Sequence, residues 1–215
     1  MPLQDFFSVL NHNERRELRS IMRRRRFERN EVVFHQGDPG SSIHVIESGW
    51  FLVQVLTRAG ERVGMTIEAP GDVFGELALL NTDGVRTATI RALRPAETMS
   101  LEGHQFNDLR RRKPEIDRFL VALLTARVER LTVQLAEVAW TPADQRVCRQ
   151  VVRLLQAFDG GTIYLKQSEV ASLAQTTRPT VSNALNDLAR QGIVSTGRGF
   201  IDVLDPAGLQ RQAEP

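Results

Sequence analysis

The chain has 215 residues, a formal net charge of +2 and 41% hydrophobic residues, which is ordinary composition for one large or two small globular domains. This composition excludes collagen-like, fibrous and disordered classes. The sequence lacks any run of about 18 apolar residues, so no transmembrane helix is expected. The N-terminal segment lacks the apolar core of a signal peptide, which predicts a cytoplasmic protein. The single cysteine, Cys148, excludes an internal disulfide framework, an iron–sulfur cluster and a cysteine-based zinc finger within one chain.

The basic residues are almost all arginine, because only Lys113 and Lys166 of the 28 are lysine. The arginine fork suits phosphates and guanine edges, which fits a nucleic-acid binder. A GC-rich genome produces the same bias, so overall charge does not decide between the two. The run Arg23–Arg26 is interpreted as a solvated face.

The first half of the chain predicts a helix followed by short strands. Residues 1–20 have a helical pattern of apolar positions: Phe6, Phe7, Leu10, Leu18 and Ile21. From Val32 to about Leu101, β-rich runs alternate with glycine and proline turns at a spacing of roughly 8–12 residues. This texture predicts a small β barrel or sandwich.

A long helix is predicted from Pro114, a good first-turn residue. Its apolar seam repeats for about three heptads, at Val121, Leu124, Val128, Leu131, Leu135 and Val138. We interpret the seam as a dimer coiled coil; the alternative is a core helix packed on its own barrel. The pattern breaks near Ala139–Thr141, and Thr141 is predicted to cap a new helix that starts at Pro142.

The last third predicts that helix, a strand over Thr162–Leu165, two short helices and a hairpin over Ile193–Leu204. The expected fold class is α+β. The expected domains are a β-rich domain at residues 1–113, a dimerisation helix at residues 114–140 and a C-terminal domain at residues 141–215.

One stretch combines the features of an anion site. Gly75 allows the backbone to approach a ligand closely. The segment Glu76–Leu80 predicts a helical turn with free N–H groups, Arg86 adds a charge-assisted fork, and Thr87 adds a hydroxyl. A glutamate beside a phosphate suits a nucleotide, whose ribose 2′-hydroxyl needs an acceptor. Glu76 and Arg86 can also pair with each other when the pocket is empty.

A second candidate site is a pair of short helices near the C-terminus. Ser168 is predicted to cap a helix through Ala174, and Thr177 to cap a second helix that runs to about Arg190. The predicted buried face consists of Val170, Leu173, Val181, Leu185 and Leu188. The outward residues near the start of the second helix are Arg178, Pro179, Ser182, Asn183 and Asn186. Such a pair fits reading of the DNA major groove, and Arg198, between two hairpin glycines, suits a phosphate contact.

These features occur in an order that resembles the Crp/Fnr superfamily of bacterial transcription regulators, over about residues 5–204. The resemblance implies a β-roll cyclic-nucleotide-binding domain, a dimerisation helix and a winged helix–turn–helix domain. It implies that Glu76 holds the ribose 2′-hydroxyl, Arg86 the cyclic phosphate, and Thr87 the phosphate or the base. By the same resemblance, Gly75 and Leu77 line the pocket.

The resemblance also implies the partners and the mechanism. We expect a homodimer that binds a palindromic operator in double-stranded DNA, with RNA polymerase as a further partner and with neither a metal nor a catalytic residue. The expected effector is cAMP, and Thr87 leaves cGMP open because its hydroxyl can meet the guanine amine. Effector binding is expected to reposition the long helix and to rotate the DNA-binding domains about Ala139–Thr141.

The recognition helix departs from the family pattern Ser-Arg-Glu-Thr-Val, because this chain has Thr177, Arg178, Pro179, Thr180 and Val181 at those positions. Arg178 keeps the guanine-reading role that the resemblance implies. Pro179 cannot accept a hydrogen bond from cytosine, and Asn183 stands where the family has a second arginine. An asparagine amide prefers adenine, so we expect a different half-site.

Two further departures affect the ligand domain. Members that respond to cAMP carry a Thr-Ser pair on the long helix that touches adenine, and the matching residues here are Leu131 and Thr132. Base selectivity is therefore left open between the two cyclic nucleotides. His44 interrupts an apolar run that the family usually keeps. As a lone strand histidine it is predicted to face solvent, and it is assigned no role.

Three other functions fit the sequence less well than a cyclic-nucleotide-responsive DNA-binding regulator. A haem sensor of the same superfamily would need a histidine ligand, but His12, His35, His44 and His104 are scattered and lie outside the Glu76 stretch. A cyclic-nucleotide module that controls a kinase or channel would not need the C-terminal helix pair. An enzyme is not expected, because the sequence has no phosphate-binding Gly-Lys-Ser/Thr loop, no His-Glu-x-x-His motif and no nucleophile elbow.

Overall fold

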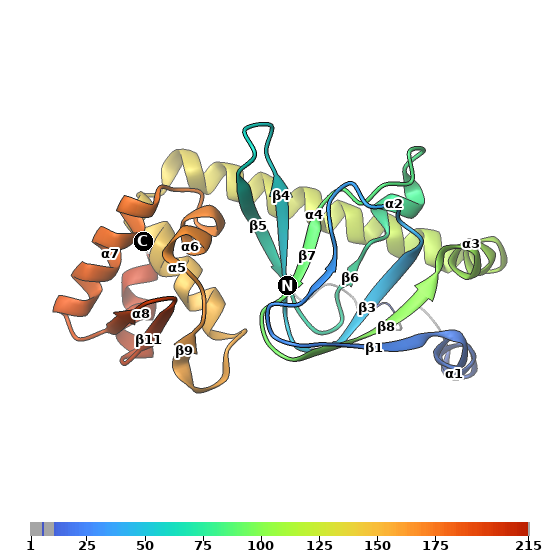
Figure 1. Cartoon of the computed structure of the whole chain (residues 1–215), viewed down its shortest axis with the longest axis horizontal. Helices are drawn as coiled ribbons and strands as arrows, with labels where there is room; N and C mark the ends of the chain where they lie inside the picture. The colour runs from blue at the N-terminus through green and yellow to red at the C-terminus, as the bar shows by residue number, and fades with distance from the viewer. Residues whose placement is uncertain (1–5, 7–10, 215) are drawn as a thin grey trace. The chain divides into compact units, whose positions relative to one another are not determined.

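The computed structural model describes Phe6 and residues 11–214, with the backbone alone at Asp159. The described chain folds into two compact units, and Figure 1 shows their elements. The first unit comprises the described residues up to Leu56 together with Ile67–Arg130, and the second comprises Thr57–Thr66 together with the residues from Leu131 onward. The α+β fold class predicted from the sequence is confirmed.

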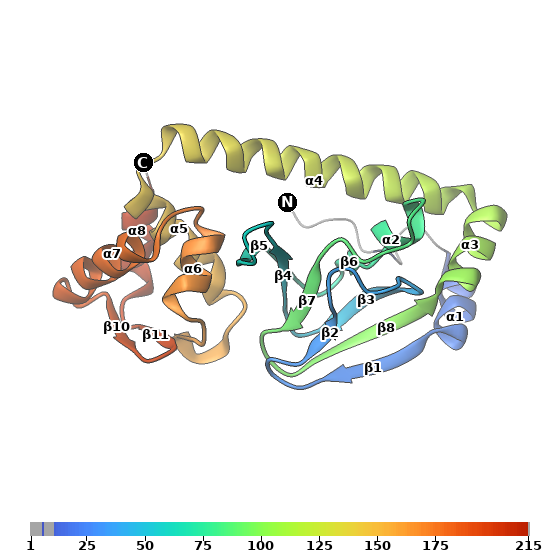
Figure 2. The same cartoon turned by 45° about the horizontal axis from the view of Figure 1, so that its top comes forward.

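Two four-stranded sheets are formed mainly by residues of the first unit, although β5 begins in the segment assigned to the second. One has the strand order β1-β8-β3-β6 and consists of β1 (Arg23–Phe27), β8 (Ala96–Glu102), β3 (Ser42–Ser48) and β6 (Val73–Phe74). The other has the order β2-β7-β4-β5 and consists of β2 (Val32–Phe34), β7 (Thr89–Ala92), β4 (Phe51–Leu56) and β5 (Arg62–Glu68). In the first sheet β8 pairs antiparallel with both β1 and β3, and Figure 2 shows it between them.

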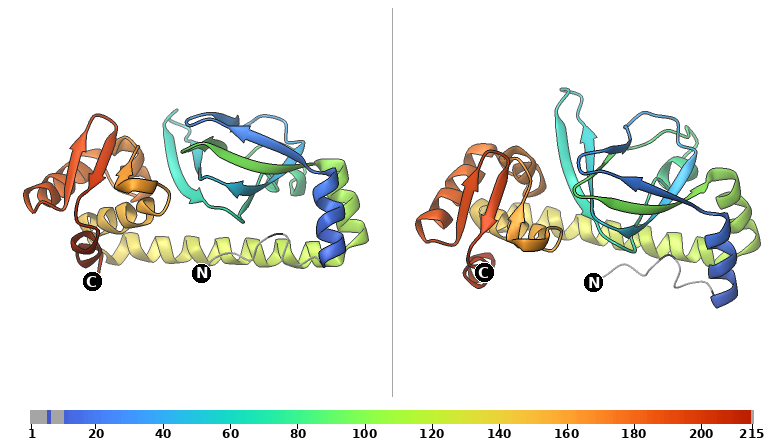
Figure 3. Two further views of the ribbon diagram at one scale, coloured as in Figure 1. Left: turned by 90° about the horizontal axis from the view of Figure 1, so that it is seen from below. Right: turned by 60° about the horizontal axis from the view of Figure 1, so that its bottom comes forward.

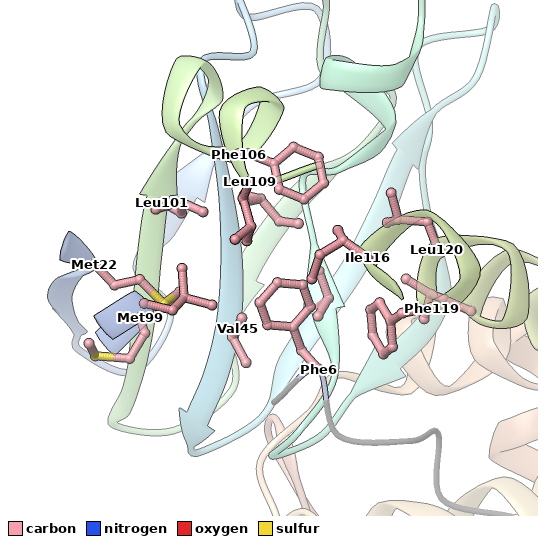
Figure 4. Packing of buried hydrophobic residues seen from close by; sticks show 14 residues of the cluster. Phe6, Met22, Val45, Met99, Leu101, Phe106, Leu109, Ile116, Phe119 and Leu120 are labelled. Carbon is pink, nitrogen blue, oxygen red and sulfur yellow. The ribbon is translucent and has the colours of Figure 1, made fainter. Parts of the chain in front are cut away.

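Alternation of side chains along the strands gives the first sheet two apolar faces. Phe27, Phe51 and Phe74 pack in a cluster formed by strands of both sheets. Figure 4 shows the second cluster, where Val45 and Met99 of the first sheet face the helices. The helices that cover this face are α1 (His12–Ile21), α3 (Gly103–Arg112) and the first half of α4 (Pro114–Trp140).

Helix α1 begins with a capping box, in which the Asn11 side chain accepts from the Glu14 backbone and Glu14 accepts from the Asn11 backbone. The side chain of Glu14 also pairs with Lys113, and Figure 3 shows α1 beside α3. Helix α1 covers the second half of the segment predicted to be helical over residues 1–20. Leu18 is buried in the core as expected, whereas Phe7 and Leu10 lie outside the described residues.

Helix α4 carries two apolar surfaces. Ile116, Phe119, Leu120 and Leu123 are buried against the sheet and helices of the first unit. The heptad seam lies on another face, and Val121, Val128 and Leu135 are 63%, 62% and 70% exposed in the single chain. The helix therefore packs on its own β-roll and also presents a separate apolar stripe.

The second unit is built from helices and a three-stranded antiparallel sheet. In chain order its elements after α4 are α5 (Ala143–Leu155), the 3₁₀ turn η2 (Asp159–Gly161), β9 (Thr162–Ile163), α6 (Gln167–Leu173), α7 (Arg178–Arg190), β10 (Val194–Gly197), β11 (Phe200–Val203) and α8 (Pro206–Ala213). The strand order is β10-β11-β9.

The caps of this unit differ in part from the sequence prediction. Thr177 caps α7 as expected, because its Oγ1 accepts from the Thr180 backbone at 3.4 Å. The prediction that Ser168 caps α6 is wrong. This helix starts one residue earlier, at Gln167, where Lys166 provides the cap position and Glu169 returns a hydrogen bond to the Lys166 backbone. In the part of the chain that the structure describes, every helix is too short or too polar to cross a membrane.

Candidate ligand pocket and nucleic-acid interface

The predicted anion site lies where β6 ends and the short helix α2 (Leu77–Leu80) begins. Gly75 has a φ of +87°, a left-handed conformation that favours glycine. A Cβ atom at this position would lie 2.5 Å from Arg86 Nη1 and 2.9 Å from the Ser42 carbonyl oxygen. Glycine therefore provides both the turn and the space in which the Arg86 guanidinium lies.

Arg86 is only 4% exposed, although it carries a permanent positive charge. Its Nη1 donates to the Ser42 carbonyl at 2.7 Å and to the Gly75 carbonyl at 2.9 Å, and its Nη2 donates to Ser42 Oγ at 3.0 Å. Its guanidinium carbon lies 4.0 Å from the centre of the Phe34 ring. Burial lowers the pKa of Arg86, and the charges of Glu76 and Asp38 oppose that effect.

Glu76 is 1% exposed, and its ionic partner is Arg127 of α4. The direct pair between Glu76 and Arg86 that the sequence allowed is therefore not formed. The physical reason is that the two terminal nitrogens of Arg86 already donate to oxygens of Ser42 and Gly75. Helix α4 instead brings a second guanidinium, that of Arg127, to the Glu76 carboxylate. Arg127 also donates to the Val73 carbonyl at 2.6 Å.

Four buried side-chain atoms among the described residues have no hydrogen-bond partner: Glu76 Oε2, Arg86 Nε, Arg127 Nε and Glu68 Oε2. The first two belong to the side chains that the sequence assigned to the ligand. A buried acceptor and a buried donor left open are costly unless a ligand satisfies them. Their chemistry fits a molecule that brings a hydroxyl to Glu76 and an anionic oxygen to Arg86. The residues present therefore fit a nucleotide with a phosphate and a free ribose hydroxyl.

The remaining predicted pocket residues are less constrained. Leu77 is half-buried at the start of α2, and Thr87 is exposed beside Arg86. Leu131, 48% exposed, and Thr132 lie on α4 in the second unit. Their predicted contact with the base stays a prediction.

A second buried carboxylate lies near Arg127. Glu68, the last residue of β5, is 2% exposed, and its Oε1 lies 3.5 Å from Arg130 Nη2. Burial raises the pKa of Glu68 to about 8, with a further rise from Asp72, although Arg127 and Arg130 act in the opposite direction. At neutral pH burial outweighs the two arginines, so Glu68 is mostly protonated.

The prediction that His44 faces solvent is wrong. His44 is 5% exposed and stacks on Phe74, with ring centroids 5.0 Å apart and an interplanar angle of 8°. It lies on the face of β3 that meets the other sheet, where its ring also packs near Phe27 and Phe34. Its ring nitrogens satisfy their hydrogen bonds with Ser42 and Thr98.

In the second unit, α6 and α7 form the predicted helix–turn–helix. The predicted buried face is confirmed, since Val170, Leu173, Val181, Leu185 and Leu188 are at most 6% exposed. Arg178, Pro179 and Asn183 are exposed at the start of α7, and Ser182 is half-buried. The hydroxyls of Thr177 and Thr180 lie 2.9 Å apart and bond to each other. Arg198 is exposed at the turn of the β10–β11 hairpin.

Arg146 holds the turn between α6 and α7, and the sequence analysis missed it. Its guanidinium donates to the carbonyls of Ala174 and Gln175 at 3.1 and 3.0 Å and to that of Thr141 at 2.7 Å. Gln175 has a φ of +50°, which is uncommon for a residue with a side chain. Arg146 thus stabilises the turn that sets the start of the exposed helix.

Arg127 and Ser42 were also missed. Arg127 lies next to Val128 of the predicted heptad seam, and nothing in the local sequence links it to a glutamate 51 positions earlier. The available signal was the spacing of Arg127 and Arg130, because residues three positions apart lie on the same face of a helix. Within the described residues, no group of three or more His, Cys, Asp or Glu side chains is placed to hold a metal ion.

A β-roll followed by a winged helix–turn–helix is the architecture of a DNA-binding protein with a separate ligand-binding domain. Residues 24–113 match the cyclic nucleotide-binding domain family, and residues 145–212 match the Crp-like helix-turn-helix domain family. The cyclic AMP receptor protein of Thermus thermophilus is 31% identical over 194 residues, which cover 90% of this chain and 89% of that protein. The CRP-like cAMP-activated global transcriptional regulator of Mycobacterium tuberculosis is 30% identical and covers 87% and 86%.

The crystal structure of the Thermus thermophilus catabolite activator protein covers 98% of each chain at 30% identity, with a TM-score of 0.56. The chain belongs to the Crp/Fnr superfamily of DNA-binding transcription regulators with a cyclic nucleotide-binding domain. Members of this family are regulators rather than enzymes, as the sequence analysis expected.

The raised pKa of Glu68 predicts a pH-dependent stability. A carboxyl group whose folded pKa of about 8 exceeds its ordinary value of 4.5 stabilises the fold when protonated, so its contribution is lost as pH rises through this interval. Glu68→Gln should remove this loss. Relative to the variant, the wild type should lose at most about 1.4 kcal/mol of unfolding free energy per pH unit.

Urea unfolding of the wild type and of Glu68→Gln at pH 5 and pH 8 measures this difference. Glu129→Gln, an exposed change on the same helix as Arg130, is the control and should show no pH-dependent difference. A constant difference between wild type and Glu68→Gln across this range would contradict the assignment.

Proposed function

We propose that the protein is a homodimeric transcription regulator whose DNA binding is switched by a cyclic nucleotide, with cAMP as the first candidate and cGMP as the second. The observation that carries this proposal is the pair of open polar atoms in the pocket, Glu76 Oε2 and Arg86 Nε. Both are buried, they belong to side chains of opposite charge, and both side chains already have other partners that hold them in place.

The two atoms match the two polar features of a cyclic nucleotide. The free 2′-hydroxyl of the ribose would donate to Glu76, and the anionic phosphate would accept from Arg86. A charge-assisted hydrogen bond to a guanidinium is stronger than a neutral one, and its geometry selects a phosphate. Arg127 would keep Glu76 ionised and oriented. The two relatives with about 30% identity are named for cAMP, which favours cAMP over cGMP.

The dimer is proposed from the exposed stripe on α4. A soluble chain rarely exposes a continuous apolar row of this kind, and a heptad spacing suits pairing with the same helix of a second copy. A two-fold dimer would present two copies of α7 to successive major grooves about 34 Å apart. RNA polymerase is proposed as a further partner because the family consists of transcription regulators.

In the proposed mechanism, the effector biases a two-state equilibrium of α4 and the DNA-binding unit. Arg178, Pro179 and Asn183 would read base edges, and Arg198 would contact a phosphate. Thr177, Thr180 and Ser182 would hold the start of the helix against the DNA backbone. The Ala139–Thr141 segment is proposed as the place where the orientation changes.

Arg86→Ala should weaken cyclic-nucleotide binding by at least about 100-fold, because it removes charge-assisted hydrogen bonds to the phosphate. Calorimetric titration of the purified protein with cAMP and with cGMP measures the affinity and the number of sites, which should be one per subunit. Arg91→Ala, a change in the neighbouring strand β7, should leave the affinity unchanged. If neither nucleotide binds the wild type, the proposed effector class is wrong.

Arg178→Ala should weaken operator binding by about 1–3 kcal/mol per half-site and leave nucleotide binding intact. The operator would be a duplex selected from a random pool with the wild-type protein, and fluorescence anisotropy would measure its affinity. Arg190→Ala lies at the other end of α7, where Arg190 pairs with Asp187, and serves as the control. Equal losses from both variants would show that α7 does not read DNA through its N-terminal half.

Leu135→Asp should convert the dimer to a monomer, because it places a charge in the proposed seam. Leu135 is 70% exposed in the single chain, so the change should not disturb the subunit's fold. Sedimentation velocity distinguishes the two states. Ala136→Glu is the control, since its heptad-equivalent residue is Glu129. A wild type that sediments as a monomer at micromolar concentration would refute the proposed dimer.

A further inference from the structure

His44 is a buried titratable side chain near the anion site that the proposed function does not use. Its Nδ1 lies 3.0 Å from Thr98 Oγ1, and its Nε2 lies 3.2 Å from Ser42 Oγ. The ring stacks on Phe74 and also lies near Phe34, with centroids 6.2 Å apart. Both polar atoms of the ring are therefore held, and one of them contacts a residue that binds Arg86.

The imidazole is neutral over the working pH range. Burial, and to a smaller extent the charges of Arg86 and Arg25, lower the pKa of His44 to about 3. A neutral imidazole has one N–H, so one ring nitrogen must accept. Thr98 is fully buried, and among the described residues its hydroxyl contacts no acceptor other than His44 Nδ1. We assign the donor role to Thr98 and the ring proton to Nε2, because the Thr98 hydroxyl is fully buried and needs this acceptor, whereas Ser42 is only half-buried.

This tautomer determines what Ser42 does. His44 Nε2 donates to Ser42 Oγ, and Arg86 Nη2 donates to the same oxygen at 3.0 Å. The two donors use both lone pairs of the hydroxyl, which fixes its rotation. The Ser42 carbonyl accepts from Arg86 Nη1 at 2.7 Å. The two oxygens of Ser42 thus bind the edge of the guanidinium that is formed by Nη1 and Nη2, which is called its end-on edge below.

The other edge of Arg86 is left for a ligand. Phe34 packs against the guanidinium plane at 4.0 Å, so the plane cannot tilt freely. With the end-on edge held by Ser42, the Nε–Nη2 edge remains, and Nε is buried without a partner. That edge offers two parallel N–H donors, the geometry that a phosphate accepts.

We propose that His44 is a positioning residue of the anion site: it acts through Ser42 to orient Arg86, so that the Nε–Nη2 edge faces the phosphate of the bound nucleotide. This inference rests on the proposed nucleotide function. It differs from a packing role, because a phenylalanine would fill the same aromatic cluster but would release the Ser42 hydroxyl.

His44→Phe tests the proposal. It should weaken cAMP binding by about 5- to 20-fold when Arg86 is present and should have no further effect in an Arg86→Ala background. Calorimetric titration of the four proteins of this double-mutant cycle gives the coupling. Where Arg86→Ala binds too weakly to titrate, Arg86→Lys replaces it. His44→Phe combined with Thr98→Val keeps the test available if His44→Phe alone fails to fold, because Thr98→Val removes the buried hydroxyl that would lose its acceptor.

A second measurement needs no nucleotide. In ¹⁵N-arginine NMR, the Arg86 guanidinium, identified by its loss in Arg86→Ala, should rotate slowly in the wild type and faster in His44→Phe. Ser100→Ala is the matched control, since Ser100 lies on the same strand as Thr98 but donates its hydroxyl to the Arg23 carbonyl. It should change neither the affinity nor the rotation.

The outcomes separate the two proposals. If the wild type binds neither nucleotide, the proposed function fails, and the NMR measurement alone decides whether His44 orients Arg86. If the wild type binds and His44→Phe binds equally well, the positioning role is overturned. Equal losses of affinity in the Arg86 and Arg86→Ala backgrounds overturn it too, because they would show a general structural effect.

Discussion

The first unit buries two charged side chains, and its structure must compensate for the hydration that they lose. Arg86 and Glu76 are almost completely buried, and burial of an unpaired charge costs far more than a single packing contact contributes. Arg86 donates hydrogen bonds to two backbone carbonyls and to a serine hydroxyl, and Glu76 forms an ion pair with Arg127. Gly75 follows from this constraint, because a side chain there would occupy the place of the guanidinium. Glu76 Oε2 and Arg86 Nε are left without a hydrogen-bond partner, and the proposed ligand would supply one to each.

Helix α4 meets three different requirements along one length. Its first turns bury Ile116 and Leu120 in the core, which fixes the helix against the β-roll. Arg127 and Arg130 follow and contact the carboxyl groups of Glu76 and Glu68 in the roll. The apolar seam continues to the end of the helix on a separate face. One element therefore joins the core and the candidate ligand pocket and then enters the second unit.

The second unit depends mostly on local interactions. The Thr177 cap, the apolar spacing of α7 and the glycines of the β10–β11 hairpin are all short-range features. Arg146 acts over a longer range, since it joins the start of α5 to carbonyls of the turn before α7, and Arg149 of the same helix donates to the Ala213 carbonyl. The contacts of Arg146 hold Gln175 in a left-handed conformation. The exposed residues of α7 are thus presented from a turn that is stabilised from outside the helix pair.

Much of this protein could be predicted from its sequence, because the relevant signals are local. Turn glycines, helix caps and the apolar periods of α4 and α7 act over a few residues, and they sufficed for the fold class and for most of the element order. The helices α3 and α8 were not predicted. Motif spacing carried the resemblance to the family, which the comparisons with known proteins confirmed.

Only the tertiary structure decided which groups meet. The pairing of Glu76 with Arg127, the burial of His44 and the grip of Ser42 on Arg86 all join residues that are distant in sequence. The alternation of side chains along a strand does not determine whether a polar residue faces water or a second sheet, because that depends on what packs over that face. A guanidinium likewise takes whichever acceptors the fold brings within about 3 Å, and the sequence does not record that distance.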